Sequence, residues 1–247
     1  MAIWIGASWT RRWAFALAVW MIGLVNVSCA TQEFPEAVRQ TLAGRSNPRT
    51  ANAAAVADAA SGSLLVVMSY GFGCSGSGPG NGLRDVADTI RRLHPGQRVI
   101  TRAWNDDDGV VATIRGHAGP VLLVGHSFGG SKSIEFAAAA GRPIDHLLLL
   151  DPVPYRDWGI RHGGKYFVIP DAVRDAVCFY RPAGAWPISY PIVNPSSPAV
   201  NRERSLGHAA FGESAEVREY ILSVCNAEAT KAKSMAGTRG GGVNGHS

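Results

Sequence analysis

Features that mark several common protein classes are missing from this sequence of 247 residues. It has no stripe of basic residues interleaved with aromatic ones, so its net charge of +5 does not predict nucleic-acid binding. Its four cysteines and seven histidines show no zinc-site spacing. It also has no internal repeat and no linker that would separate two domains. We therefore expect one globular domain with no metal, no cofactor and no nucleic-acid partner.

The N-terminal segment lacks the length of a membrane span. The apolar run Trp13–Val25 follows two arginines and falls short of the roughly 20 residues that a spanning helix needs. A positive start, an apolar core and small residues at Ser28 and Ala30 are typical of a cleaved export signal. The sequence thus predicts a signal peptide at residues 1–30 and a periplasmic or secreted protein.

Cysteine is scarce, and export would place it in an oxidising compartment. Cys29 leaves open a lipoprotein anchored at that residue, and an uncleaved N-terminal segment would tether the protein to a membrane. Cleavage after Ala30 leaves Cys74, Cys178 and Cys225, an odd number, so at least one thiol has no partner within the chain. Cys178–Cys225 is the disulfide that we predict, with three buried, unpaired thiols as the alternative.

Short apolar runs alternate with segments of helical periodicity along residues 63–226. The runs contain almost no polar positions, which is typical of parallel strands covered on both faces. The sequence therefore predicts an α/β fold: a single domain at residues 31–226, with a mostly parallel sheet and helices on both faces. The polar tail at residues 227–247 is predicted to be disordered. Strands are expected at 63–70, 97–103, 121–124, 145–153 and 175–181, and helices at 83–94, 106–117, 131–141 and 214–225.

A glycine-rich turn around one serine interrupts the pattern between an expected strand and an expected helix. Gly125–Gly130 reads Gly-His-Ser-Phe-Gly-Gly, which contains G-x-S-x-G. In that motif the glycines let neighbouring backbones pass closely, and the serine hydroxyl is displayed at the carboxyl edge of the sheet. Ser127 is therefore the candidate nucleophile.

Two phosphate-binding motifs are alternatives that the sequence argues against. Gly125–Gly130 has the glycine spacing of a P-loop, but Ser131 stands where that loop needs its lysine. Gly71–Gly76 matches G-x-G-x-x-G, but no helix opens on its last glycine. The next strand also ends at Ala103 without an acid for a ribose.

The segment VLLVGHSFGGSKSIEFA, residues 121–137, resembles the α/β-hydrolase superfamily of lipases, esterases and thioesterases. The resemblance implies a compact fold without a large cap and a small-molecule ester or thioester substrate, with amide or peptide bonds as an alternative. It also implies a triad in the chain order serine, acid, histidine. His208 fits the histidine because it lies in a loop just before the last expected helix.

Acidic residues are absent where the family most often has its catalytic acid. No aspartate or glutamate occurs in Ala176–Arg202, which includes the strand after next beyond the serine. Asp151, at the tip of the strand that follows the serine helix, is the acid that we predict instead. Asp157, Asp171 and Glu203 are the reserves. The empty interval also supports a non-enzymatic alternative, a hydrolase-like binding protein with an incomplete triad.

The resemblance implies an oxyanion hole of two backbone N–H groups. One belongs to Phe128, which follows the serine, and Phe72 is predicted as the second donor. The oligomeric state is left open by the sequence. A short aromatic flap is expected from four residues, with core packing as the alternative: Tyr155, Trp158, Tyr166 and Phe167.

Overall fold

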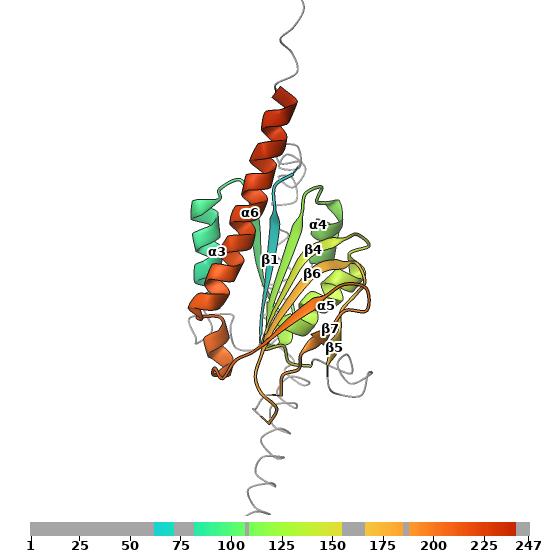
Figure 1. Cartoon of the computed structure of the whole chain (residues 1–247), viewed down its shortest axis with the longest axis vertical. Coiled ribbons are helices and arrows are strands. Elements are labelled where there is room, and N and C mark those ends of the chain that lie inside the picture. Colours follow the sequence, from blue (N-terminus) through green and yellow to red (C-terminus); the bar gives the residue numbers. More distant parts are fainter. Residues whose placement is uncertain (1–61, 72–81, 107–108, 155–165, 185–187, 241–247) are drawn as a thin grey trace, which may run out of the picture. The chain divides into compact units, whose positions relative to one another are not determined.

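A computed structural model describes residues 62–71, 82–106, 109–154, 166–184 and 188–240 of the chain. Its centre is a six-stranded sheet in the order β2-β1-β3-β4-β6-β8, and every strand pair in it is parallel (Figure 1). A separate pair, β5 (Phe167–Val168) and β7 (Ile192–Val193), is also parallel. The six strands are β1 (Leu65–Tyr70), β2 (Arg98–Ala103), β3 (Val121–His126), β4 (Ile144–Leu150), β6 (Val173–Tyr180) and β8 (Ala199–Glu203).

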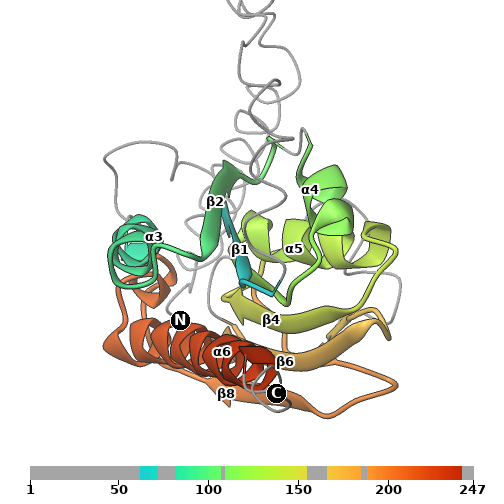
Figure 2. The same cartoon turned by 90° about the horizontal axis from the view of Figure 1, so that it is seen from above.

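Helices cover both faces of the sheet (Figure 2). One face packs against α3 (Gly82–Leu93) and α6 (Ala215–Gly240). The other face packs against α4 (Val110–Gly116) and α5 (Phe128–Ala139). A short 3-10 helix, η3 (His208–Phe211), precedes α6. The predicted α/β class, with a mostly parallel sheet and helices on both faces, is confirmed.

The central strands explain why their sequences are apolar at every position. All six residues of β1 and all six of β3 are buried. Side chains of β1 alternate between the two cores: Val66 and Met68 pack toward α3 and α6, whereas Leu65 and Val67 pack toward α4 and α5. A strand that contributes to two cores has no solvent face, so it has no polar alternation.

Two expectations from the sequence are wrong about the C-terminal part of the chain. The strand expected to be last, β6, is followed by β8, which pairs with it along Ala176–Tyr180. The tail expected to be disordered from Ala227 is helical as far as Gly240. Glu228 explains part of this difference, because it accepts hydrogen bonds from Lys231, at 2.6 Å, and from His146, at 3.4 Å. A polar sequence can therefore extend a helix whose earlier turns are packed on a face of the sheet.

The predicted Cys178–Cys225 disulfide is also wrong. Both cysteines are free and buried. Cys178 belongs to the core between the sheet and α4 and α5, whereas Cys225 lies in the core under α3 and α6. The sheet separates the two sulfur atoms, and burial raises the pKa of the Cys225 thiol to about 12.

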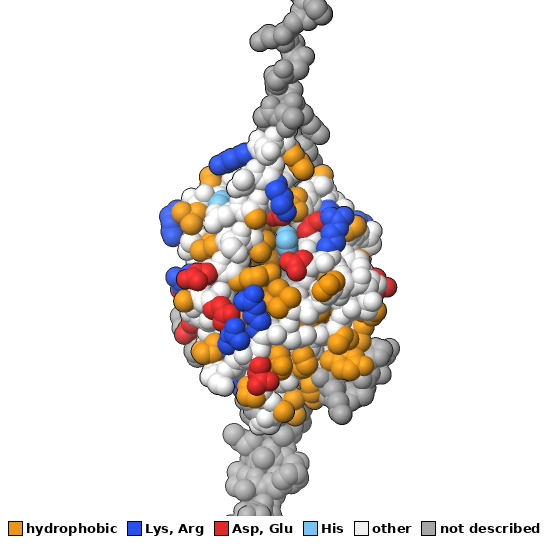
Figure 3. All heavy atoms as spheres, viewed as in Figure 1, with side chains coloured by type: hydrophobic (Ala, Val, Ile, Leu, Met, Phe, Trp, Pro, Cys, Tyr) orange, Lys and Arg blue, Asp and Glu red, His pale blue; other side chains and the backbone are white. Residues whose placement is uncertain are grey.

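The face of the molecule seen in Figure 3 carries lysines and arginines interspersed with acidic and apolar side chains. It shows no continuous surface of one sign that would attract a polyanion. Within the ranges described above, no helix is both long and apolar enough to span a bilayer.

The direction in which the chain adds strands reverses between β1 and β3. The chain adds β2 on one side of β1 and then places β3, β4 and β6 successively on the other side. Ligands of open α/β sheets bind where the order reverses in this way, outside the carboxyl ends of the strands. Here that point lies between the ends of β1 and β3, next to Gly71 and Ser127.

Gly129 allows α5 to approach the end of β1. A Cβ atom at Gly129 would lie 2.1 Å from the carbonyl oxygen of Ser69, which no rotamer change can relieve. We expect Gly129→Ala to lower the free energy of unfolding by about 1–3 kcal/mol, because the helix must shift away from the strand. Urea denaturation followed by circular dichroism measures this change.

Gly96→Ala is the matched control, because a Cβ there meets no heavy atom within 4 Å and its φ is not positive. It should change the unfolding free energy by less than about 0.5 kcal/mol. Equal effects of the two substitutions would contradict the steric argument.

Candidate active site

Ser127 occupies a strained turn between β3 and α5. Its φ of 58° and ψ of −126° are rare for a residue with a side chain, and such a conformation costs about 1–3 kcal/mol. The turn is held by hydrogen bonds from Ser127 N to Leu150 O, at 3.0 Å, and from Val153 N to Ser127 O, at 3.1 Å. This is the strand-turn-helix geometry that the G-x-S-x-G motif predicts.

Asp151 follows β4 as Ser127 follows β3, and the sheet register brings the two together. His126 pairs with Leu150 across the two strands, so the next residues of both chains emerge side by side at the carboxyl edge. Asp151 is fully buried, and its φ of 46° is also in the left-handed region, which aspartate tolerates better than most residues. Its backbone N–H donates to Phe179 O at 2.7 Å.

His208 enters the same edge from η3. Phe211, which is completely buried, anchors this short helix in the core under α3 and α6. At the other end of η3, the buried ring of His126 approaches the carbonyl oxygen of His208, and its Nε2–H donates to that oxygen at 2.8 Å. The two imidazole rings are stacked at a tilt, with centroids 4.8 Å apart.

Ser127, His208 and Asp151 form a continuous line of hydrogen bonds. Nδ1 of His208 bonds to Oδ2 of Asp151, and its Nε2 lies 2.9 Å from Oγ of Ser127. With the proton on Nδ1, Nε2 is free to accept the serine proton. The structure therefore brings together the three residues that the sequence selected as nucleophile, base and acid. In the chain, His208 lies 57 positions after Asp151 and 81 positions after Ser127.

Arg181, which sequence reasoning missed, contacts the same carboxylate. It follows β6 directly, and its Nε–H donates to Oδ2 of Asp151 at 2.6 Å. Its side chain is only 7% exposed, so this is a buried ion pair. Arg181 stands at the strand tip where the resemblance places an acid, and this basic residue inside the acid-free interval was the available signal.

Burial, rather than charge, dominates the titration of His126. Desolvation lowers its pKa from the ordinary value of 6.5 to about 4, and the bond to the His208 carbonyl opposes this effect only in part. His126 is therefore neutral at neutral pH. It supports the backbone of His208 without adding charge to the site. Sequence reasoning missed this role, because a histidine before the serine carries no signal by itself.

Of the two predicted oxyanion donors, only Phe128 lies within the described residues. Phe128 is the first residue of α5, and N–H groups in the first turn of a helix have no acceptor within that helix. Its ring packs against Trp104 at a centroid distance of 5.3 Å. Phe72 lies outside the described residues. Gly71, just before it, is so close to the serine that a Cβ there would meet Ser127 Cβ at 2.4 Å.

The other sequence candidates lie elsewhere or outside the described residues. Asp171 is exposed in a turn before β6, and Glu203 is exposed at the end of β8. The flap residue Phe167 is buried in the core with α4 and α5, which fits the packing alternative. Asp157, Tyr155 and Trp158 fall within residues 155–165, outside the described ranges.

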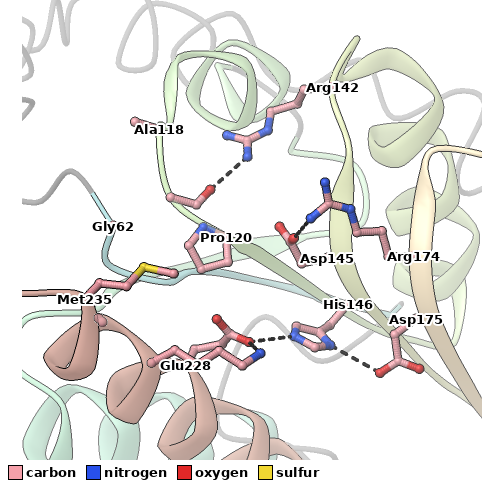
Figure 4. Close-up of a pocket in the computed structure, with 13 residues that line it drawn as sticks. Gly62, Ala118, Pro120, Arg142, Asp145, His146, Arg174, Asp175, Glu228 and Met235 are labelled. Carbon is pink, nitrogen blue, oxygen red and sulfur yellow. Dashed lines mark hydrogen bonds and ion pairs between the residues drawn. The ribbon is translucent and has the colours of Figure 1, made fainter. Parts of the chain in front are cut away.

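A cavity of about 580 Å³ at the amino edge of the sheet is a second candidate for a ligand-binding site (Figure 4). Its charged side chains contact groups of the protein itself. Arg174 binds Asp145 at 2.8 Å, and His146 lies between Asp175, at 3.2 Å, and Glu228, at 3.4 Å. Since Asp145 also accepts a hydrogen bond from a backbone N–H of β3, these contacts resemble structural links between elements rather than groups that await a ligand.

The depressed pKa of His126 makes a prediction about stability. The unfolded chain binds a proton there below about pH 6.5, whereas the folded chain binds it only near pH 4. Stability is therefore complete above pH 6.5 and is lost as the pH falls toward 4. We expect His126 to account for about 2 kcal/mol of the loss between pH 7 and pH 5.

Urea denaturation of the wild type and His126→Asn at both pH values measures this contribution. Burial also lowers the pKa of His117, so the wild-type loss contains more than one histidine. The difference between the two proteins isolates His126. An asparagine variant with an undiminished pH dependence would contradict the assignment.

Comparison with known proteins adds little to this site. No protein-family model matches the chain, and no curated protein matches it. Among solved structures, the chain is similar to a Pectobacterium atrosepticum protein that is described, provisionally, as a YdeN-like hydrolase. The similarity covers 67% of this chain and 92% of that one, with 18% sequence identity and a TM-score of 0.41. A likeness this distant supports no argument about activity, so the functional argument depends on the geometry of the site.

Proposed function

We propose that this protein is a serine hydrolase of the α/β-hydrolase type that cleaves carboxylic esters or thioesters. The observation that carries the proposal is the line of hydrogen bonds from Ser127 through His208 to the buried Asp151. Further support comes from the strained backbone of Ser127 and from its place at the switch point of the sheet.

The proposed reaction uses each group in turn. Oγ of Ser127 attacks the substrate carbonyl carbon while Nε2 of His208 takes the hydroxyl proton. The oxyanion that forms is stabilised by backbone N–H groups, with Phe128 as one donor. Collapse expels the alcohol or thiol, which receives the proton from His208 and leaves an acyl-serine. Water, deprotonated by His208, then attacks the acyl group and releases the acid and the free serine.

Asp151 has a defined part in this proposal. Its carboxylate holds the proton of His208 on Nδ1 and stabilises the imidazolium that forms. The non-enzymatic alternative depended on the lack of an acid after the strand now seen as β6. The contact between Asp151 and His208 weakens that alternative, because an acid from the neighbouring strand occupies the required position.

Export is part of the proposal and depends only on the N-terminal sequence. Residues 1–30 have the charge and apolar pattern of a signal peptide, and they lie outside the described residues. The proposed site of action is therefore the periplasm or the medium.

Ser127→Ala should abolish labelling by a fluorophosphonate probe, which forms a bond to an activated serine with loss of fluoride. Hydrolysis of a p-nitrophenyl ester should fall by several orders of magnitude, because the nucleophile is removed. The melting temperature should stay close to that of the wild type. Mass spectrometry of labelled peptides checks the position, and a label on another serine would refute the assignment.

Asp151→Asn should lower the rate of ester hydrolysis by about 10⁴, because an amide favours the wrong tautomer of His208. It should also destabilise the fold by roughly 3–5 kcal/mol, because it removes the negative partner from the buried Asp151–Arg181 ion pair. Rates are therefore compared per folded molecule, as measured by circular dichroism.

Asp171→Asn serves as the control, since Asp171 is exposed and distant in register from the carboxyl edge. It should retain activity within about twofold. If Asp151→Asn retained activity within tenfold of the wild type, the acid would have to be another residue.

A further inference from the structure

The carboxylate of Asp151 uses one oxygen for two partners. Oδ2 accepts from Nδ1 of His208 and from Nε of Arg181, whereas Oδ1 has no hydrogen-bond partner among the described residues. The imidazole of His208 and the guanidinium of Arg181 therefore bond to the same carboxylate oxygen. We propose that Arg181 is a positioning residue that orients Asp151 and lowers the pH at which His208 becomes an effective base. This inference rests on the proposed function.

Burial makes the charge of Arg181 effective at this site. Asp151 is fully buried, and the side chain of Arg181 is 7% exposed. Counterions and water screen a pair at the protein surface, but they screen a buried pair far less. A full positive charge that touches the acid of a triad must therefore affect how readily its histidine takes up a proton.

The direction of the effect does not depend on which group holds the proton. A neighbouring cation opposes proton uptake by the imidazole and by the carboxylate alike. Removing the cation therefore moves protonation of the coupled Asp151–His208 pair to higher pH. In the proposed reaction only the neutral imidazole accepts the serine proton, so the variant needs a more alkaline medium to reach its maximal rate.

The other ionisable side chains that the structure describes near this pair do not replace Arg181. His126, at the end of β3, interacts electrostatically with His208 and Asp151, but its pKa of about 4 leaves it neutral. On β6, burial raises the pKa of the Cys178 thiol well above its ordinary value. From β8, Arg202 is paired with Glu216 of α6 at 3.1 Å. Among the described residues, Arg181 is thus the arginine or lysine in direct contact with Asp151.

The shape of the arginine side chain also matters. Arg181 spans from the tip of β6 to the tip of β4, the adjacent strand, and its rigid planar group meets Oδ2 through Nε. Asp151 itself has a strained backbone, with φ at 46°. A fixed donor on the carboxylate restricts its rotation, which keeps Oδ2 directed at His208.

The sheet contains a matched pair that serves as a control. Arg174 and Asp145 also join β6 to β4, but at the amino edge, where Arg174 is 66% exposed. Arg174→Gln also removes an arginine that joins β6 to β4 through an aspartate, but at a more exposed position and without contact with the triad. A general effect of lost charge or weakened strand pairing would affect both variants.

The test measures the rate of fluorophosphonate labelling at Ser127 from pH 5 to pH 9. Arg181→Gln keeps an N–H donor and loses the charge, so its midpoint should rise by about one pH unit or more. Arg181→Lys keeps the charge and loses the planar donor, so its midpoint should stay near wild type while its plateau rate falls about tenfold. Arg174→Gln should match the wild type in both quantities.

Each outcome decides the inference. A folded Arg181→Gln variant with the wild-type midpoint overturns it, because a merely structural arginine would change stability and plateau rate alone. If that variant does not fold, Arg181→Met, which also removes the charge, decides by its midpoint: a raised midpoint supports the inference and a wild-type midpoint overturns it. If the wild type is not labelled at Ser127 at any pH, the proposed function fails first, and this result is distinct from an unshifted midpoint.

Discussion

A single buried carboxylate organises the carboxyl edge of this protein. Asp151 is fully enclosed, and an isolated charge in that position would be too costly to retain. Arg181 and His208 both bond to its Oδ2, so strands β4 and β6 and the η3 segment are joined through one oxygen atom. The same contacts that make the charge tolerable also define the orientation of the imidazole toward Ser127. Stability and the proposed chemistry therefore depend on the same interaction.

Backbone geometry at this edge is as constrained as the charges. Ser127 and Asp151 both have positive φ values, and both follow strands that pair in register. The strain is maintained by close packing around it: Gly129 contacts β1, and a Cβ at Gly130 would lie 2.7 Å from Pro152. Glycines around the serine are thus required by the backbone of β1 and by Pro152, as well as by the turn itself.

The two edges of the sheet contrast in a way that favours the carboxyl edge as the site of function. At the amino edge, the exposed Arg174 pairs with the half-buried Asp145 beside a cavity, and ion pairs that reach the solvent contribute little energy. At the carboxyl edge, the equivalent bridge between the tips of the same strands is buried. Its acid, Asp151, also bonds to His208, whose other ring nitrogen faces Ser127. Strain, buried charge and a depressed histidine pKa occur together there, as is typical of functional sites.

Local pattern was enough to determine the α/β class, the strand-turn-helix at Ser127 and three candidate side chains, because uninterrupted apolar strands and glycine spacing are local consequences of burial. Asp151 could be selected from the sequence because its strand tip held an acid where the following interval held none. Only the tertiary structure decided that Arg181 and His126 contact the site, that Cys178 and Cys225 lie on opposite faces of the sheet, and that the helix continues past Ala227. These features depend on strand order and on contacts between residues that are distant in the chain. The local sequence around each of these residues allows several packing partners, and only the arrangement of the strands in the sheet determines which partner it meets.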